Sequence, residues 1–130
     1  VWYSAHTVSS CSTIWLTHYD NARHVAIQQK QLMLVSISGP FCSICTAIEK
    51  KFFTNETILR TLCNTIKIKI SDLAQVEQSA AHLQQKFAIK GVPTILLIDP
   101  VNEQEIARWN SDLYEETVEE FSAELTKLLS

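Results

Sequence analysis

Two cysteines three positions apart are the residues most able to do chemistry, in the segment Phe41-Cys42-Ser43-Ile44-Cys45. The segment follows an apolar run over residues 32–37, which is typical of a buried strand. Cys42 would then lie at the N-terminus of a helix, where unpaired backbone N–H groups favour a thiolate. Cys45 follows one helical turn later, which is close enough for a disulfide to form. This spacing predicts thiol–disulfide chemistry.

A second motif, Gly91-Val92-Pro93-Thr94, stands before another apolar run over residues 95–98. Pro93 breaks the chain just before a predicted strand, where a proline is tolerated because it need not donate to the sheet. Taken together, this motif and the C-x-x-C pair are much more specific than either is alone.

Length and composition narrow the class of protein. A chain of 130 residues is long enough for one domain with its own core, and we expect an N-terminal arm over 1–13 and the domain over 14–130. The net charge of −3 argues against nucleic acid as the main partner. No apolar run approaches the roughly 20 residues that span a bilayer. Because the chain starts at Val1 rather than Met, we expect a processed form whose signal peptide or anchor is not visible.

The remaining cysteines do not suggest a metal centre. Cys11 and Cys63 stand alone, and a C-x-x-C among alternating strands and helices indicates redox chemistry before zinc. A zinc site would need a second cysteine pair or histidines at ligand spacing, and the four histidines show no such spacing. We therefore expect no metal and no organic cofactor. Cys63 is expected to be a small buried residue on a helix face.

Hydrophobic periodicity gives a coarse outline of the elements. We expect helices over 19–30, 42–53, 56–63, 75–88 and 114–129, and strands over 32–38, 65–71, 94–98 and 105–109. Strands separated by helices imply parallel pairing, and the last two strands imply an antiparallel hairpin. Over 65–71, isoleucines alternate with Lys67 and Lys69, which predicts a strand with one buried face.

These motifs, in this order, resemble the thioredoxin fold. The segments 14–22 and 50–56 are similar to the bacterial periplasmic branch that includes the C-terminal domain of DsbD and exported thioredoxin-like proteins. The resemblance covers residues 14–129, which is nearly the whole chain. It implies an α/β architecture with a central mixed β-sheet flanked by helices.

The resemblance also implies roles for single residues. Cys42 matches the exposed nucleophile that attacks a substrate disulfide, and Cys45 matches the cysteine that resolves the mixed disulfide. Pro93 matches the cis-proline beside the cysteine pair, and Val92 the residue whose backbone pairs with substrate. Glu49 matches an acidic residue one turn after the second cysteine.

Three positions depart from the family pattern. Phe41 stands where a tryptophan is usual, Thr46 where a basic residue is common, and Ser36 where the strand usually carries a buried acid. The loss of that acid would leave Glu49 or water to move the proton of the resolving thiol. The simpler interpretation of Glu49 is a solvated helix residue beside Lys50.

The function predicted from the sequence is thiol–disulfide oxidoreduction. Phe41, Ser43 and Ile44 are expected to form a rim that touches substrate, with simple surface exposure as the alternative. The same cysteines could reduce, oxidise or isomerise, and Val92 before the proline is closer to reducing thioredoxins, which favours disulfide reduction or isomerisation.

The expected partners are protein thiols and disulfides of exported proteins, with a DsbD-like membrane reductant to recharge the domain. We expect a monomer in the periplasm or another exported location. The alternative is a redox-inactive thioredoxin-fold module that binds proteins, because residues 98–109 are similar to the UAS domains of ubiquitin-pathway adaptors. The intact C-x-x-C argues against that alternative.

Overall fold

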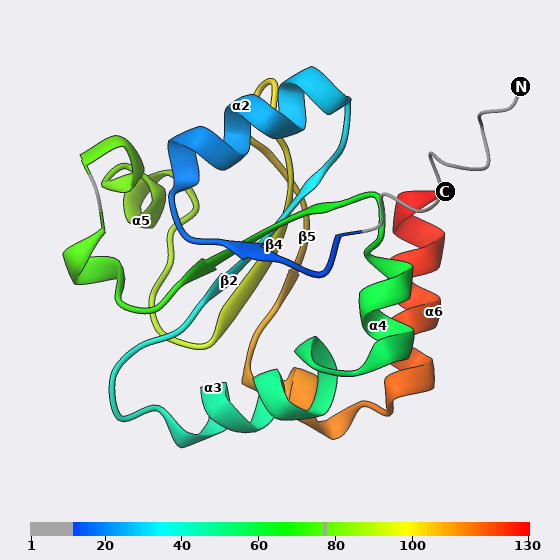
Figure 1. Ribbon diagram of the computed structural model, residues 1–130. Coiled ribbons are helices and arrows are strands. Elements are labelled where there is room, and N and C mark those ends of the chain that lie inside the picture. The colour runs from blue at the N-terminus through cyan, green and yellow to red at the C-terminus, as the bar shows by residue number, and fades with distance from the viewer. Residues whose placement is uncertain (1–11, 77) are drawn as a thin grey trace, which may run out of the picture.

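The computed structural model describes residues 12–76 and 78–130, and its centre is a mixed five-stranded sheet (Figure 1). The strand order is β1-β3-β2-β4-β5. The first three of these run parallel to one another, and β4 and β5 are antiparallel to their neighbours. The strands are β1 (Trp15–Leu16), β2 (Met33–Ile37), β3 (Ile66–Ile70), β4 (Thr94–Asp99) and β5 (Gln104–Trp109).

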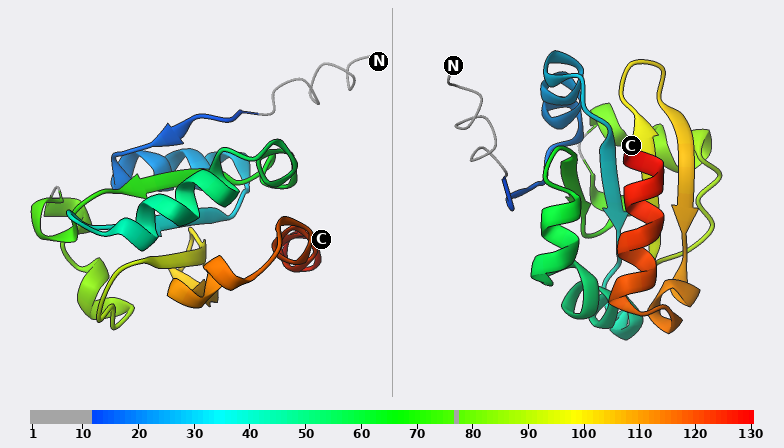
Figure 2. Two further views of the ribbon diagram at one scale, coloured as in Figure 1. Left: turned by 90° about the horizontal axis from the view of Figure 1, so that it is seen from below. Right: turned by 90° about the vertical axis from the view of Figure 1, so that its right-hand side faces the viewer.

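Helices cover both faces of this sheet (Figure 2). They are α2 (Tyr19–Gln29), α3 (Ser43–Ile48), α4 (Glu56–Thr61), α5 (Leu83–Lys86) and α6 (Val118–Leu129). A π-helical turn, η1 (Glu49–Phe53), continues α3 directly. Short 3-10 turns complete the set: η2 (Leu73–Gln75), η3 (Gln78–Ala80) and η4 (Ser111–Glu115).

Strand β2 lies at the centre of the sheet and divides the core into two clusters. All five of its residues are buried. Met33, Val35 and Ile37 pack with α2 on one face, and Leu34 packs with α4 and α6 on the other, because successive side chains of a strand point to opposite faces. A strand that is covered on both faces is continuously apolar, which explains why the sequence pattern located it.

The expected α/β architecture with a mixed sheet is confirmed, and so are most of the element positions. Helix α4 begins at Glu56 as predicted, since the Asn55 side chain accepts hydrogen bonds from the backbone N–H groups of Thr57 and Ile58 at 2.9 and 3.3 Å. Lys30 ends α2 in the left-handed conformation, with φ of 56°.

Two predicted helices were wrong in extent. Residues 75–88 do not form one helix, because Val76 adopts an extended backbone with ψ of 162° between η2 and η3. The apolar residues of this segment still pack against the α2-side cluster. Short helical turns therefore bury the same side chains that one continuous helix was expected to bury. The last helix begins at Val118 rather than at 114, because Thr117 and Glu120 form a reciprocal capping box that fixes its start.

The strands also differ from expectation in three ways. Trp15 and Leu16, which lie in none of the predicted strands, pair with β3 as strand β1. Strand β4 follows a helical segment but runs antiparallel to β2, so the rule of parallel pairing fails there. Lys67 is only 2% exposed whereas the Lys69 side chain is 41% exposed, so the lysine face of β3 is buried at one of its two lysines.

The two cysteines outside the C-x-x-C motif differ in what the structure says of them. Cys63 lies in the turn after α4 and is half-buried, so its expected place as a buried residue on a helix face was wrong. Cys11 and most of the predicted N-terminal arm lie outside the described residues.

Candidate active site

The cysteine motif joins the end of β2 to the start of α3. Cys42 and Cys45 form a disulfide with Cα atoms 5.3 Å apart. Cys42 is the N-cap of α3, and its Sγ accepts a hydrogen bond from the backbone N–H of Cys45 at 3.2 Å. Cys42 is half-buried, whereas Cys45 is only 4% exposed. An incoming thiol or disulfide therefore reaches the first sulfur more easily than the second.

The proline motif is brought to the same end of the sheet by strand pairing. Ile37, the last residue of β2, pairs with Thr94, the first residue of β4, in antiparallel register. The chain that leaves β2 therefore runs beside the chain that enters β4. A Cβ atom on Gly39 would lie 3.3 Å from the side chain of Val92, which shows how close the two loops are. The peptide bond between Val92 and Pro93 is cis.

Two side chains hold the proline loop, Thr94 from within the motif and Asn110 from outside it. The Thr94 hydroxyl donates to the carbonyl of Gly91 at 2.7 Å. The Asn110 amide donates to the carbonyl of Pro93 and to Thr94 Oγ1, both at 3.4 Å. The sequence analysis missed Asn110, because it lies 17 residues from Pro93 and belongs to no motif. The loop also lines an open groove of about 480 Å³.

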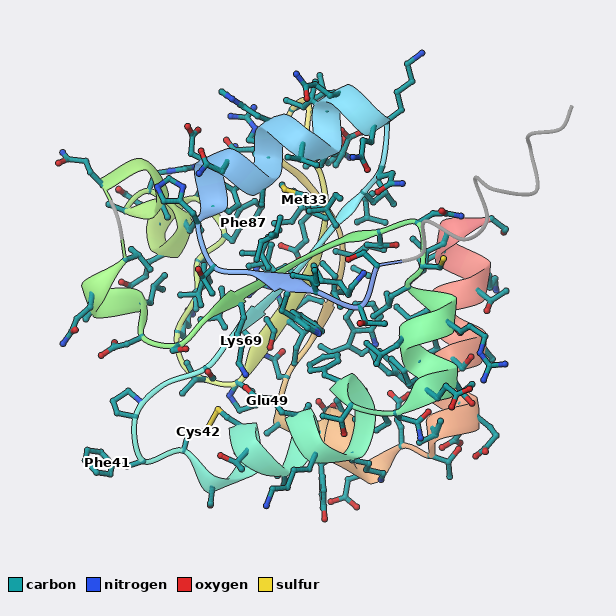
Figure 3. The ribbon with its side chains drawn as sticks, viewed as in Figure 1. Met33, Phe41, Cys42, Glu49, Lys69 and Phe87 are labelled. Carbon is teal, nitrogen blue, oxygen red and sulfur yellow. A yellow bond between two sulfur atoms is a disulfide. The ribbon has the colours of Figure 1, made fainter. Side chains whose placement is uncertain are left out.

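Glu49 lies one turn after Cys45, and positions i and i+4 share a helix face. Its carboxylate forms an ion pair with Lys69 of β3, with Oε1 and Nζ 3.1 Å apart (Figure 3). Both residues line a small cavity of about 130 Å³ together with Ser36, which is 5% exposed and directly opposite Lys69 in the parallel register. Glu49 is therefore not the isolated solvated residue of the simpler interpretation.

Lys69 is a second residue that the sequence analysis missed as part of the site. The only available signal was its position on β3, because a parallel strand beside β2 places one of its residues next to Ser36. The alternation of isoleucine and lysine gave no reason to separate Lys69 from Lys67.

Only part of the predicted substrate rim is exposed to solvent. Phe41 is fully exposed and has a left-handed backbone with φ of 60°, and Figure 3 shows its ring pointing away from the molecule. Val92 is 41% exposed and Ser43 is also exposed. Ile44 is different, because its side chain packs in part against the α6-side core. The exposed apolar side chains of the two motif segments are thus Phe41 and Val92.

Neither a metal centre nor a membrane-spanning helix is found among the described residues. No group of three or more histidine, cysteine or acidic side chains there is arranged to hold a metal ion. None of the helices in that part of the chain is long and apolar enough to cross a membrane.

Known proteins with similar sequences carry disulfide exchange in their names. The thiol:disulfide interchange protein DsbD of Pseudoalteromonas atlantica is 29% identical over 84 residues, which are 65% of this chain and 14% of that protein. The DsbD of Yersinia pestis is 29% identical over 75 residues, 58% of this chain and 12% of the relative. The chain therefore spans only a small part of the length of these relatives.

Solved structures agree in fold. A thioredoxin from Thermus thermophilus superimposes with a TM-score of 0.70 at 17% identity, covering 90% of this chain and 88% of that one. A DsbH oxidoreductase gives a TM-score of 0.70 at 12% identity, covering 92% and 87%. The long form of spinach chloroplast thioredoxin F gives 0.66 at 12% identity, covering 97% and 94%.

The fold and the disulfide pair together support thiol–disulfide oxidoreduction as the general activity. A family model described as thioredoxin-like matches residues 14–100, from β1 into the turn after β4. On this match, and with the sheet order and the C-x-x-C disulfide already seen, the chain belongs to the thioredoxin-like family.

Proposed function

We propose that this domain reduces, or isomerises, disulfides of exported proteins through Cys42 and Cys45. The observation that carries the proposal is the asymmetry of the pair, with a half-buried sulfur at the helix start and a buried one behind it. The structure holds the oxidised state. The working cycle starts from the dithiol form, which a DsbD-like membrane reductant would restore.

The first step is the attack of the Cys42 thiolate on a partner disulfide. The S–S bond of the partner breaks, a mixed disulfide forms, and one partner sulfur leaves as a thiolate that takes up a proton. The Cys45 N–H that now donates to Cys42 Sγ would remain beside the thiolate, and a hydrogen bond to the charged form favours it. Phe41 and Val92 would contact the apolar part of the partner.

The second step needs a base for Cys45. Its thiol loses a proton, and the thiolate attacks Cys42 Sγ, which restores the internal disulfide and releases the second partner thiol. Because Cys45 is buried, its thiolate is costly to form without a nearby proton acceptor. Glu49 lies on the same helix face, and Lys69 holds its carboxylate at the small cavity beside Ser36. We assign the proton to Glu49, directly or through water.

The direction of the reaction is tested by the reduction potential of the pair. Equilibration with defined dithiothreitol or glutathione buffers should give a value near that of thioredoxin, about −270 mV, rather than the value of about −120 mV of DsbA. A value at the oxidising end would reverse the proposed direction. If no disulfide formed at any buffer potential, the enzyme proposal would be wrong, and the alternative of a redox-inactive binding module would be favoured.

The order of the two cysteines is tested by single variants. Cys42→Ser should abolish reduction of a protein disulfide, whereas Cys45→Ser should accumulate mixed disulfides that can be isolated by non-reducing electrophoresis. Thr126→Ser serves as the control, since Thr126 is an exposed residue of α6 and belongs to neither motif. The mechanism fails if Cys42→Ser keeps the wild-type rate.

A further inference from the structure

The open groove at the proline loop extends from that loop to the end of β5. It has a volume of about 480 Å³, and the segment that follows α5, residues 88–93, lines one side of it. Thr94, Arg108 and Asn110 line it from the sheet. These three residues belong to one face of the sheet, because Leu96 pairs with Arg108 in antiparallel register and the other two follow at steps of two. The groove is therefore a continuous surface between the proline loop and β5.

The groove lies within reach of a chain that is bound at the disulfide. Val92 and Pro93 line the groove, and a Cβ atom on Gly39 would lie 3.3 Å from the Val92 side chain. Gly39 in turn stands three residues before Cys42. An extended chain advances about 3.3 Å per residue, so a few residues of a partner suffice to pass from Cys42 over Val92 into the groove.

The charged side chains that line the groove are cations. They are Lys90 and Arg108, and none of the described Asp or Glu residues lines it. Arg108 pairs with Glu105 through hydrogen bonds of 2.8 and 3.0 Å, which offset much of its charge. Lys90 is exposed, and its ammonium makes no ion pair or hydrogen bond with another described residue. Lys90 therefore leaves the groove with an uncompensated positive charge, in a chain whose net charge is −3.

Hydrogen-bond donors remain available in the groove as well. A guanidinium carries five N–H donors. Glu105 accepts from Nε and Nη2 of Arg108, and the carbonyl of Phe87 accepts from Nη2, so the two N–H groups of Nη1 have no partner among the described residues. The carbonyls of Gly91 and Pro93, by contrast, already accept from neighbouring side chains. Charge and hydrogen bonding thus both favour an anionic acceptor in this groove.

We propose that the groove binds an acidic side chain of the partner protein, a few residues from the cysteine that Cys42 attacks. This rests on the proposed function and adds a preference for disulfides in acidic segments. The partner carboxylate would accept from the Lys90 ammonium and from Nη1 of Arg108, and such charge-assisted hydrogen bonds are stronger than neutral ones. The apolar contacts of Phe41 and Val92 give no selection by charge, so Lys90 and Arg108 determine this specificity.

The proposal is tested with three peptides that share one intrachain disulfide and differ only in carrying Glu, Gln or Lys a few residues to either side of the cysteines. The rate of their reduction by the dithiol form of the whole chain is divided by their rate with dithiothreitol, which corrects for the intrinsic reactivity of each disulfide. At low ionic strength the Glu peptide should react about threefold faster than the Gln peptide, and the Lys peptide should be slower than both.

The possible results separate this proposal from the proposed function. Equal corrected rates for the three peptides would overturn the preference for acidic segments and leave disulfide reduction intact. If dithiothreitol reduced all three peptides and the domain reduced none, the proposed function would be wrong, and the acidic preference with it. The preference should also shrink as salt is added, because an exposed ion pair is screened.

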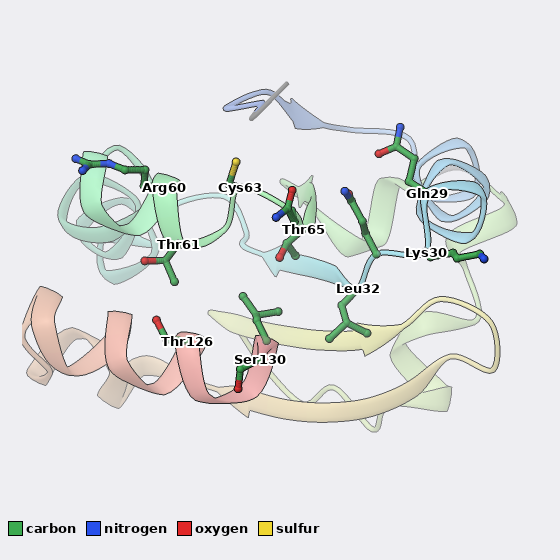
Figure 4. Close-up of a pocket in the computed structure, with 12 residues that line it drawn as sticks. Gln29, Lys30, Leu32, Arg60, Thr61, Cys63, Thr65, Thr126 and Ser130 are labelled. Carbon is green, nitrogen blue, oxygen red and sulfur yellow. The ribbon is translucent and has the colours of Figure 1, made fainter. Parts of the chain in front are cut away.

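Variants separate binding in the groove from general attraction to a positive charge. Lys90→Met should remove most of the preference for the Glu peptide over the Gln peptide, and Lys90→Arg should retain it, because both cations bind carboxylates. Lys30→Met is the matched control, because Lys30 is an exposed lysine that lines a separate cavity of about 610 Å³, before the start of β2 (Figure 4). This control should keep the preference. A full preference in Lys90→Met, or an equal loss in Lys30→Met, would contradict the proposal.

Discussion

The two ends of β3 carry the same residue type and use it in different ways. Lys67 and Lys69 are two positions apart, so they point to the same face of the sheet. Lys67 is 2% exposed and donates to two backbone carbonyls, whereas the Lys69 side chain is 41% exposed and pairs with Glu49. One lysine therefore satisfies buried backbone, and the other stays in contact with solvent beside the disulfide site. The alternating pattern of a strand does not separate these two roles.

The largest difference between the two lysines should appear in stability. Lys67→Ala should lower the free energy of unfolding by about 2–3 kcal/mol, because two buried carbonyls lose their donor and the aliphatic stem leaves a void. Lys69→Ala should cost less than about 1 kcal/mol, since its ion pair is screened by solvent. Urea unfolding of both variants at pH 7 measures the contrast. Equal losses of unfolding free energy would mean that the different burial of Lys67 and Lys69 has no effect on stability.

A smaller effect is expected on the rate at the disulfide end. Glu49→Gln keeps the shape of the side chain but cannot take up a proton, so the resolving step should slow by about tenfold. This lies below the usual range for general acid–base catalysis because water in the adjoining cavity can substitute in part. Stopped-flow measurement of disulfide reduction from pH 6 to 9 measures the rate. Glu119→Gln, which makes the same change at an exposed acid of α6, is the matched control.

Two results would count against the role of Glu49. An unchanged rate in Glu49→Gln would mean that Glu49 does not accept the proton of Cys45. A slower rate that kept the wild-type pH profile would indicate that the variant perturbs packing rather than proton transfer.

The smallest effect concerns pH and the buried end. Burial lowers the pKa of Lys67 in the folded chain, so between that pKa and the ordinary lysine value near 10.4 the unfolded chain binds more protons. The free energy of unfolding should therefore rise with pH in this window, relative to Lys67→Met, by no more than about 1.4 kcal/mol per pH unit. Urea titrations of both proteins from pH 7 to 10.5 test the sign. A difference that stays constant or falls would be inconsistent with a lowered pKa.

The sequence predicted the parts of the molecule that depend on interactions between residues close together in the chain. The apolar run over 33–37 is a covered strand, and the C-x-x-C at its end is a disulfide at a helix start, because both depend on neighbours in the chain. The start of α4 at Glu56 was predicted for the same reason, because the cap at Asn55 is its neighbour in the chain. The order of the predicted elements gave the antiparallel pair of β4 and β5, and the family resemblance implied the mixed sheet as a whole.

What the sequence could not predict depends on contacts between distant segments. Asn110 reaches the proline loop only because β5 returns beside β4, and Lys69 meets Glu49 only because β3 lies next to β2. The apolar residues of segment 75–88 have the spacing of a helix, but the segment forms short helical turns. More than one backbone conformation can bring these side chains into the core, so their spacing does not determine the conformation.

The two-residue strand β1 has a consequence for self-association. Trp15 and Leu16 pair with Lys67 and Ile68, and the Trp15 ring lies 4.9 Å from that of Phe53, so β3 is an inner strand. An uncovered strand edge is a template for pairing with another chain. At the opposite edge, β5 carries Glu105 and Arg108 and a register irregularity, which discourage such pairing. Loss of Trp15 and Leu16 would thus expose the isoleucine-rich edge of β3 and promote aggregation of the folded domain.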